Sequence, residues 1–311
     1  MQELFAFYRV RKMAEANPRL AVFACGNEGG AGDIAIIPDE VNRYNIGKRC
    51  WPLLFFLTGV AGSVLGQEYA DSLHSPHALA MRLRNKVPDL VTLPLENDLQ
   101  FGVGPASATS NTLNFQPVIP FPIGKSWRIV TRTIIPLEYE DPAGEKGAPG
   151  KSGVGDINTS WFLSPGYASN EWKWGMGVVL NIPSSSDTLF GYGRWAAGPT
   201  LAVVKQKGGL SYDVLLNHQW SLGSRKVSAT LVDPSVSYTW MSGFSLDAEA
   251  QCTYDWEASQ WTVMTRLGGG HVVYLGPFPI SLELDGLAYP ARGPADPHWG
   301  IAVVFTFIQR K

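Results

Sequence analysis

One stretch of the chain alternates strictly between apolar and polar side chains. Residues 244–257 read FSLDAEAQCTYDWE, so Phe, Leu, Ala, Ala, Cys, Tyr and Trp share one parity and Ser, Asp, Glu, Gln, Thr, Asp and Glu share the other. Successive side chains of a β-strand point to opposite faces, so one face is apolar and the other polar. A half-buried strand of a soluble protein usually alternates over about 4–8 residues. This longer strand, tilted by about 40°, would cross an apolar layer of about 25 Å, and we predict that it faces lipid.

The same pattern, with turn residues between the runs, recurs along the rest of the chain. An even number of antiparallel strands is typical of single-chain bacterial barrels. The sequence therefore predicts an all-β fold, a transmembrane antiparallel β-barrel of about 12 strands. The expected strands cover residues 89–102, 111–121, 126–139, 153–165, 171–183, 194–206, 209–221, 229–240, 243–257, 259–274, 277–289 and 297–309.

Composition agrees with a barrel that is apolar outside and polar inside. Of the 311 residues only 17% are charged, whereas Trp and Tyr number 11 each. The mean hydropathy is near zero, because the two faces cancel in the average. The net charge of −2 gives no electrostatic reason to expect a nucleic-acid partner.

Residues 41–66 have the organisation of a secretory signal peptide. Lys48 and Arg49 precede an apolar run over residues 51–64, and Val64 and Gly66 are small residues before a cut at Gln67. The run is shorter than the roughly 20 residues of a transmembrane helix, although a buried core helix is an alternative reading. Residues 1–40 lack the barrel alternation, and we interpret them as an extension upstream of a true translation start near Val41.

Residues 67–88 are expected to lead into a barrel that covers residues 89–311. Ser75 and Pro76 are suitable N-cap and first residues of a short helix that runs to about Asn85. This helix carries a thin apolar stripe and several basic residues. We favour a periplasmic lead-in, with a plug inside the lumen as the alternative.

The polar parity of the strands brings charged side chains to the predicted lumen. A narrow barrel can fill its interior with ion pairs, or a polar pathway can use the same charges for selectivity, and both readings stay open. We expect Arg128 and Arg132 each to pair with an acidic residue on a neighbouring strand, and Asp156 on the next predicted strand is the nearest acidic candidate in sequence. The candidate lumen-lining residues are Glu96, Asp98, Arg128, Arg132, Glu138, Asp156, Lys173, Arg194, Asp213, Asp247, Glu249, Arg266, Glu283 and Asp285.

Tryptophans near the predicted strand ends indicate two aromatic girdles at the membrane interfaces. The candidate girdle residues are Trp127, Trp161, Trp172, Trp195, Trp220, Trp240, Trp256, Trp261 and Trp299. The odd-numbered connections between the predicted strands are long and the even-numbered ones are mostly short. Outer-membrane barrels have long extracellular loops and short periplasmic turns, so the chain is predicted to enter the barrel from the periplasmic side.

Several segments resemble a known family. They are 88–102 (PDLVTLPLENDLQFG), 111–123 (NTLNFQPVIPFPI), 127–137 (WRIVTRTIIPL), 153–165 (GVGDINTSWFLSP) and 253–263 (TYDWEASQWTV). Together the chain from about 88 to 309 resembles the outer-membrane β-barrel transporter-like proteins associated with the meta-pathway of phenol degradation. The resemblance implies an outer-membrane location, reached through barrel-assembly machinery, and passage of small molecules, including hydrophobic or aromatic ones. It identifies no binding residue.

The predicted function is therefore a porin-like channel or transporter for small solutes in the outer membrane of a Gram-negative envelope. No cofactor or metal is expected, because the chain has no Cys/His cluster with metal-ligand spacing. We do not expect an enzyme, but two enzymatic alternatives stay open. One is lipid hydrolysis on the outer wall with His218 as the base, although no Ser shares its face on that strand. The other is glycoside chemistry by carboxylates among Asp233, Asp255 and Glu257. A plugged structural barrel is the third class.

Overall fold

The computed structural model describes residues 75–141, 150–166, 171–191, 193–223 and 227–309. The expected signal peptide and upstream extension lie outside these ranges. The strands are β1 Val91–Val103, β2 Ala108–Phe115, β3 Val118–Ile123, β4 Trp127–Glu140, β5 Lys151–Val154, β6 Ile157–Pro165, β7 Trp172–Ile182, β8 Ala196–Lys207, β9 Leu210–Ser221, β10 Ser228–Thr239, β11 Phe244–Asp255, β12 Gln260–Leu275, β13 Phe278–Ala291 and β14 Trp299–Gln309. One helix, α2 Pro76–Leu83, precedes them.

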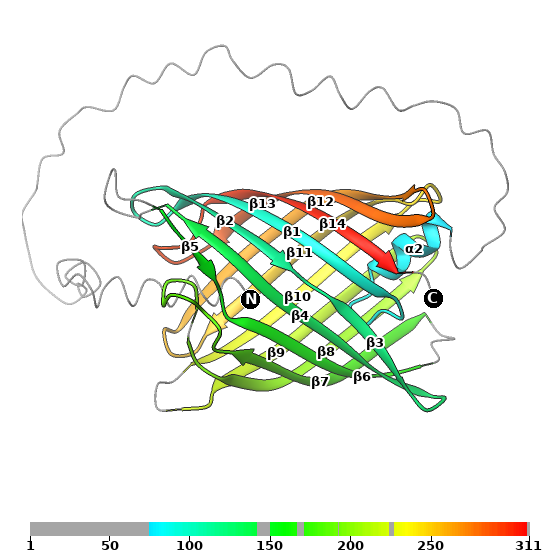
Figure 1. The fold of residues 1–311 in the computed structure, drawn as a ribbon, viewed down its shortest axis with the longest axis horizontal. Coiled ribbons are helices and arrows are strands. Elements are labelled where there is room, and N and C mark those ends of the chain that lie inside the picture. Colours follow the sequence, from blue (N-terminus) through cyan, green and yellow to red (C-terminus); the bar gives the residue numbers. More distant parts are fainter. Residues whose placement is uncertain (1–74, 142–149, 167–170, 192, 224–226, 310–311) are drawn as a thin grey trace, which may run out of the picture.

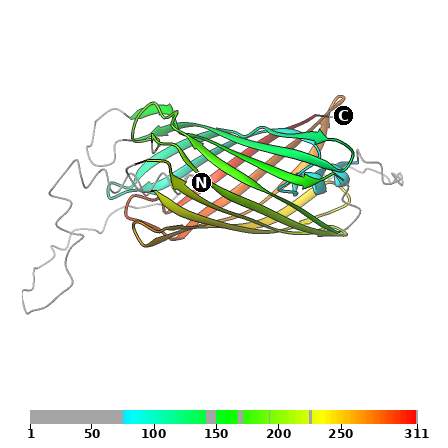
Figure 2. The same cartoon turned by 90° about the horizontal axis from the view of Figure 1, so that it is seen from below.

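The strands close into a single antiparallel barrel (Figures 1 and 2). From β6 to β14 each strand pairs with the next along the chain, and β1 closes the circle by pairing with β14 from Val91↔Gln309 to Phe101↔Trp299. The segments β2 and β3 share one position in the wall, between β1 and β4, and β5 and β6 share another, between β4 and β7. The fourteen segments thus make a 12-stranded barrel, and the predicted fold class is confirmed.

The break between β2 and β3 follows from proline. Gln116 and Pro117 separate the two segments, and β3 contains Pro120 and Pro122. Proline has no N–H to donate to a ladder, so it is confined to strand edges and irregular positions. Accordingly β3 pairs with β4 along its whole length but with β1 only at Thr92↔Val118.

The two ends of the barrel differ in their connections. The end that holds α2 and the last residue of β14, which we call the helix end, has short turns such as Gly208-Gly209 and Gly276-Pro277 (Figure 1). Gly208 and Gly276 have φ of +59° and +60°, a conformation that glycine adopts without steric cost. The opposite end, which we call the loop end, carries the longer connections 141–150, 183–195 and 292–298.

The outer face of the wall is apolar. Exposed residues such as Leu246, Met176 and Leu284 lie on the parity that the sequence assigns to lipid. All nine candidate girdle tryptophans are exposed as well. Most lie at strand ends, but Trp161 does not, because it sits opposite Thr131 within the span of β4 and β6. Apart from this position, the tryptophans gather toward the two ends of the barrel.

The segment before β1 lies inside the barrel, and the expected lead-in outside it requires correction. Ser75 caps α2 by accepting a hydrogen bond from the Ala78 N–H, as the sequence predicts. Leu79 and Ala80 of the helix pack against Val272 of β12 and Ile308 of β14 at the helix end. In the described part of the chain, no helix is long and apolar enough to cross a membrane.

The chain that follows α2 runs deeper into the lumen. Val87 is fully buried in an apolar cluster with Val130 of β4 and Phe162 of β6. Gly175 of β7 leaves the space that Val87 fills, because a Cβ there would lie 2.9 Å from Val87 Cγ1. We call residues 75–90 the inner segment. Its apolar groups find partners only on the barrel's inner face, so it packs there rather than lying free in solvent.

Candidate functional site: the lumen

Carboxylates gather on one side of the lumen, on the inner faces of β1 and β9 to β13. Most of the candidate lumen residues lie here, and they are buried or partly buried. We call this surface the acidic wall. Its members are Glu96, Asp98, Asp213, Asp233, Asp247, Glu249, Glu283 and Asp285.

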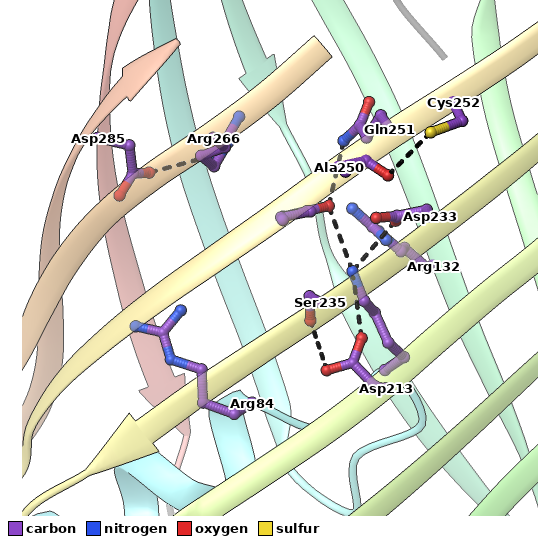
Figure 3. A network of polar contacts seen from close by, with 12 residues as sticks. Arg84, Arg132, Asp213, Asp233, Ser235, Ala250, Gln251, Cys252, Arg266 and Asp285 are labelled. Carbon is purple, nitrogen blue, oxygen red and sulfur yellow. Dashed lines mark hydrogen bonds and ion pairs between the residues drawn. The ribbon is translucent and has the colours of Figure 1, made fainter. Parts of the chain in front are cut away.

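Lys86 of the inner segment lies at the centre of the acidic wall. Its amine Nζ is 3.1 Å from Asp233, 3.4 Å from Glu249 and 3.6 Å from Asp213, which come from three successive strands, β10, β11 and β9. Figure 3 labels Asp213 and Asp233 of this group. Burial alone would lower the pKa of Lys86, but the three carboxylates outweigh it and raise the pKa above its ordinary value. The amine therefore stays protonated and fixes the inner segment to the wall.

Two guanidinium groups complete the pairing of the acidic wall. Arg84, also from the inner segment, lies 3.1 Å from both Asp247 and Glu283. Arg266 of β12 bonds Glu96 of β1 and lies 3.3 Å from Asp285. Figure 3 shows the contact of Arg266 with Asp285 as a dashed line and also labels Arg84. The acidic wall is thus matched by Arg84, Lys86 and Arg266.

Cations on the opposite side of the lumen have no such partners. Arg128 and Arg132 of β4 and Lys173 of β7 point inward, and we call them the basic wall. Within the described ranges, none of the three has a carboxylate oxygen within the 4.0 Å of a salt bridge. Arg132 donates to Gln116 Oε1 at 2.9 Å, Lys173 to Gln206 Oε1 at 2.7 Å, and Arg128 to the Val87 carbonyl at 3.5 Å.

The expectation that Arg128 and Arg132 pair with neighbouring acids was therefore wrong. Asp156, the proposed partner, is instead bound by the loop-end connection between β7 and β8. It accepts hydrogen bonds from Asn181 Nδ2, the Ser185 N–H and the Gly193 N–H. The tilt of the strands decides which inward residues face each other, and the sequence does not contain that offset.

Two cavities lie in the lumen on either side of Lys86. The loop-side cavity, of about 120 Å³, is lined by Ile134, Pro136, Glu138 and Met264 among others. The helix-side cavity, of about 190 Å³, is lined by Leu83, Thr92 and Val118 among others. The residues that both cavities share form the constriction between them: Lys86, Glu96, Gln116, Arg132, Glu249 and Arg266.

The remaining candidates lie toward the ends of the barrel. Glu138 is buried on the inner face of β4 and has a bonding partner, and Arg194 lies just before β8 at the loop end. Three charged residues that hold the lumen together, Arg84, Lys86 and Asp233, were not among the candidates. Asp233 shares the inward parity of its strand, which was the available signal. For Arg84 and Lys86 the basic composition of residues 82–86 was visible, but their place in the lumen was not.

The outer wall holds a contact that the sequence did not reveal. His218 of β9 packs against Trp220 near the loop end with the two rings tilted, and its Nδ1 lies 2.7 Å from Thr230 Oγ1 of β10. Its Nε2 lies 3.4 Å from Ser228 Oγ, on the same neighbouring strand. The sequence of β9 alone has no serine on the face of His218, whereas the pairing Thr230↔His218 brings Ser228 of the neighbouring strand near it.

The structure separates Asp233 from the other two carboxylates of the glycoside alternative. Asp233 lies inside the lumen with Lys86, whereas Asp255 ends β11 and accepts hydrogen bonds from the Glu257 and Ala258 N–H groups of the following turn. Within the described ranges, no group of three or more His, Cys, Asp or Glu side chains could hold a metal ion.

Comparison with known proteins finds similar solved structures among outer-membrane proteins. No protein-family model and no curated protein matches the sequence. An outer membrane channel from Pseudomonas putida F1 is similar with a TM-score of 0.57 and 16% identity, over 73% of this chain and 98% of that chain. The outer membrane phospholipase A from Escherichia coli has a TM-score of 0.43 and 11% identity, over 76% of this chain and 98% of that chain. A FadL homologue from Pseudomonas aeruginosa has a TM-score of 0.33 and 10% identity, over 75% of this chain and 91% of that chain. The similarity to the Pseudomonas putida channel defines the fold as that of the outer-membrane β-barrels.

Proposed function

We propose that this protein is an outer-membrane channel that lets small solutes cross through its lumen. The observation that carries the proposal is the pair of polar-lined cavities in a closed barrel with an apolar outer belt. An apolar outside and a polar inside are the properties of a barrel that surrounds an aqueous path through lipid. The fold shared with outer-membrane barrels supports the location.

In this proposal the inner segment controls the path. Lys86 lies at the constriction between the two cavities and Arg84 lines the helix-side cavity, and together they are held by five carboxylates. A solute larger than water would pass only when these side chains move aside. The channel is therefore narrow, and we expect it to favour single small molecules over bulk diffusion.

Conductance of the refolded barrel in planar bilayers tests this function. We expect small, discrete current steps, and swelling of liposomes in the smallest solutes only. A barrel that carries no current and causes no swelling would contradict the proposal and favour a plugged structural role. Fractionation of the native host's envelope would test the location separately.

A second candidate function is ester hydrolysis at the outer wall, and the contact between Ser228 and His218 is the observation that favours it. A serine nucleophile needs a base within hydrogen-bond reach and a group that orients the base, and Thr230 occupies the orienting position. Catalytic hydrogen bonds are often long before substrate binds, so 3.4 Å is compatible with this role. Hydrolysis of a short-chain p-nitrophenyl ester by the wild type, lost in Ser228→Ala, would support it. Equal rates in both would contradict it.

A further inference from the structure

Arg132 stands out among the charged side chains of the constriction. The other two cations there are Lys86 and Arg266. Lys86 lies within 3.6 Å of three carboxylates, and Arg266 contacts two others, Glu96 and Asp285. Arg132 contacts none in the described part of the chain and donates a single hydrogen bond, to Gln116 Oε1. A confined guanidinium with five N–H donors and one partner has unused capacity for a planar anion.

The carboxylates nearest to Arg132 are already matched by other groups. Gln116 connects Arg132 to Glu96 by donating to the Glu96 carboxylate at 2.7 Å, and Glu96 is paired with Arg266. Glu249 is paired with Lys86. At the far end of the loop-side cavity, Asp156 accepts three hydrogen bonds, and Glu138 has its own bonding partner.

The inner face of β4 continues from Arg132 with apolar side chains. Side chains two residues apart share a face, so Ile134 and Pro136 follow Arg132 along the same row, and Met264 of β12 also lines the cavity. Glu138, the next inward acid of this row, lies about 20 Å along the strand from Arg132. The loop-side cavity therefore offers a cation at its constricted end and an apolar surface next to it.

We propose that Arg132 and Gln116 bind the carboxylate of a small organic acid whose apolar body contacts Ile134, Pro136 and Met264. The proposal rests on the proposed function, because it names the chemical class of solute that the lumen accepts. The loop-side cavity, at about 120 Å³, is of the same order as the engineered protein cavity of about 150 Å³ that holds benzene, so it limits the acid to a short chain or at most one ring. Arginine matches a carboxylate with two parallel hydrogen bonds.

Binding of matched single-ring probes to the full barrel tests the proposal. Benzoate, benzyl alcohol and benzylamine differ mainly in the charge of one substituent, and each can be titrated by saturation-transfer NMR in detergent micelles. We expect the wild type to bind benzoate best. Arg132→Gln should weaken benzoate binding by about 10- to 100-fold, the range of a lost charge-assisted hydrogen-bonded contact, and leave benzyl alcohol unchanged. Arg132→Lys should retain part of the affinity.

Arg128→Gln is the matched control. Arg128 lies on the same strand and face and also lacks a carboxylate partner, but it lines neither cavity of the constriction. It should leave benzoate binding unchanged, and resistance of both variants to unfolding in SDS would show that the barrel is intact. Benzoate binding that survives Arg132→Gln, preference for benzylamine, or no binding of any probe would overturn the proposal.

The result is separable from the proposed channel function. A barrel that passes ions and small solutes but does not bind benzoate keeps that function and loses this inference. A barrel that binds benzoate through Arg132 yet carries no current and passes no solute keeps the binding site and loses the channel.

Discussion

The two walls of the lumen carry charge in different ways. On the acidic wall every cluster of carboxylates surrounds a cation, as with Lys86 between Asp213, Asp233 and Glu249. On the basic wall Arg132 and Lys173 are each bonded to a neutral glutamine. Removing one partner of a buried ion pair leaves an uncompensated charge, whereas removing an unpaired cation leaves none. The acidic wall therefore contributes to stability, and we expect Arg132, the member of the basic wall that lines the constriction, to contribute to selection of the solute.

The largest effect is expected from Lys86→Met. The change leaves three carboxylates of the acidic wall without their shared cation, and breaking a buried pair costs about 3–5 kcal/mol. Urea titrations of folding in lipid vesicles measure this free energy of unfolding. Lys173→Met on the basic wall is the control and should cost less, about 2 kcal/mol, the value of one hydrogen bond from a charged donor. Equal costs for the two lysines would remove the distinction between the walls.

A second variant tests whether the walls face the lumen at all. Ala248 of β11 lies on the outward parity between Asp247 and Glu249, so Ala248→Arg places a charge in lipid and should cost about 2–4 kcal/mol. Gln251→Arg on the inward parity of the same strand should cost much less, because Gln251 lines the loop-side cavity and contacts Glu249. The same folding titration measures both. A larger cost for Gln251→Arg would mean that the strand is inside out.

The sequence alone predicts the wall of the barrel well. The alternation expected over residues 243–257 corresponds to β11 at Phe244–Asp255, and that expected over 259–274 corresponds to β12 at Gln260–Leu275. The reason is local: lipid outside and polar groups inside impose a period of two on each strand independently. The inner segment shows the same principle on a smaller scale, because Ser75 and Pro76 begin α2 as their local chemistry requires.

Contacts between strands could not be predicted in this way. The partners of Arg132, and the approach of Ser228 to His218, depend on how far each strand is shifted along its neighbour. The position of Lys86 depends on the shape of the whole lumen. A short basic segment before the first strand reads the same whether it lies outside the barrel or within it, and only the closed structure supplies the carboxylates that hold it.

A smaller effect, on selectivity rather than on stability, is expected at Arg132. Because it lines the constriction and has no carboxylate partner within the described ranges, Arg132→Gln removes one positive charge from the path. The reversal potential in a KCl gradient should shift toward cation selectivity, while the free energy of unfolding falls by about 2 kcal/mol for one lost hydrogen bond from a charged donor. Arg132→Lys keeps the charge and should keep the reversal potential. An unchanged reversal potential in Arg132→Gln would place Arg132 outside the conducting path.

The smallest effect is expected from the one ion pair that the inner segment makes within itself. Arg82 and Asp89 lie 2.8 Å apart, but the Asp89 side chain is 51% exposed, and exposed pairs contribute less than about 1 kcal/mol. Burial acts to raise the pKa of Asp89, but the hydrogen bond and charge of Arg82 outweigh it and hold the pKa below the ordinary 3.8. The carboxylate form is thus favoured in the folded state. The contribution of this ion pair to stability is fully present at pH values above the ordinary pKa, and it is lost as the pH falls through the lowered pKa.

Asp89→Asn should therefore lower the free energy of unfolding by less than about 1 kcal/mol at neutral pH, and the difference from the wild type should vanish in acid. A loss as large as that of Lys86→Met would show that the exposed end of the inner segment, and not its matched charges in the lumen, holds it in place.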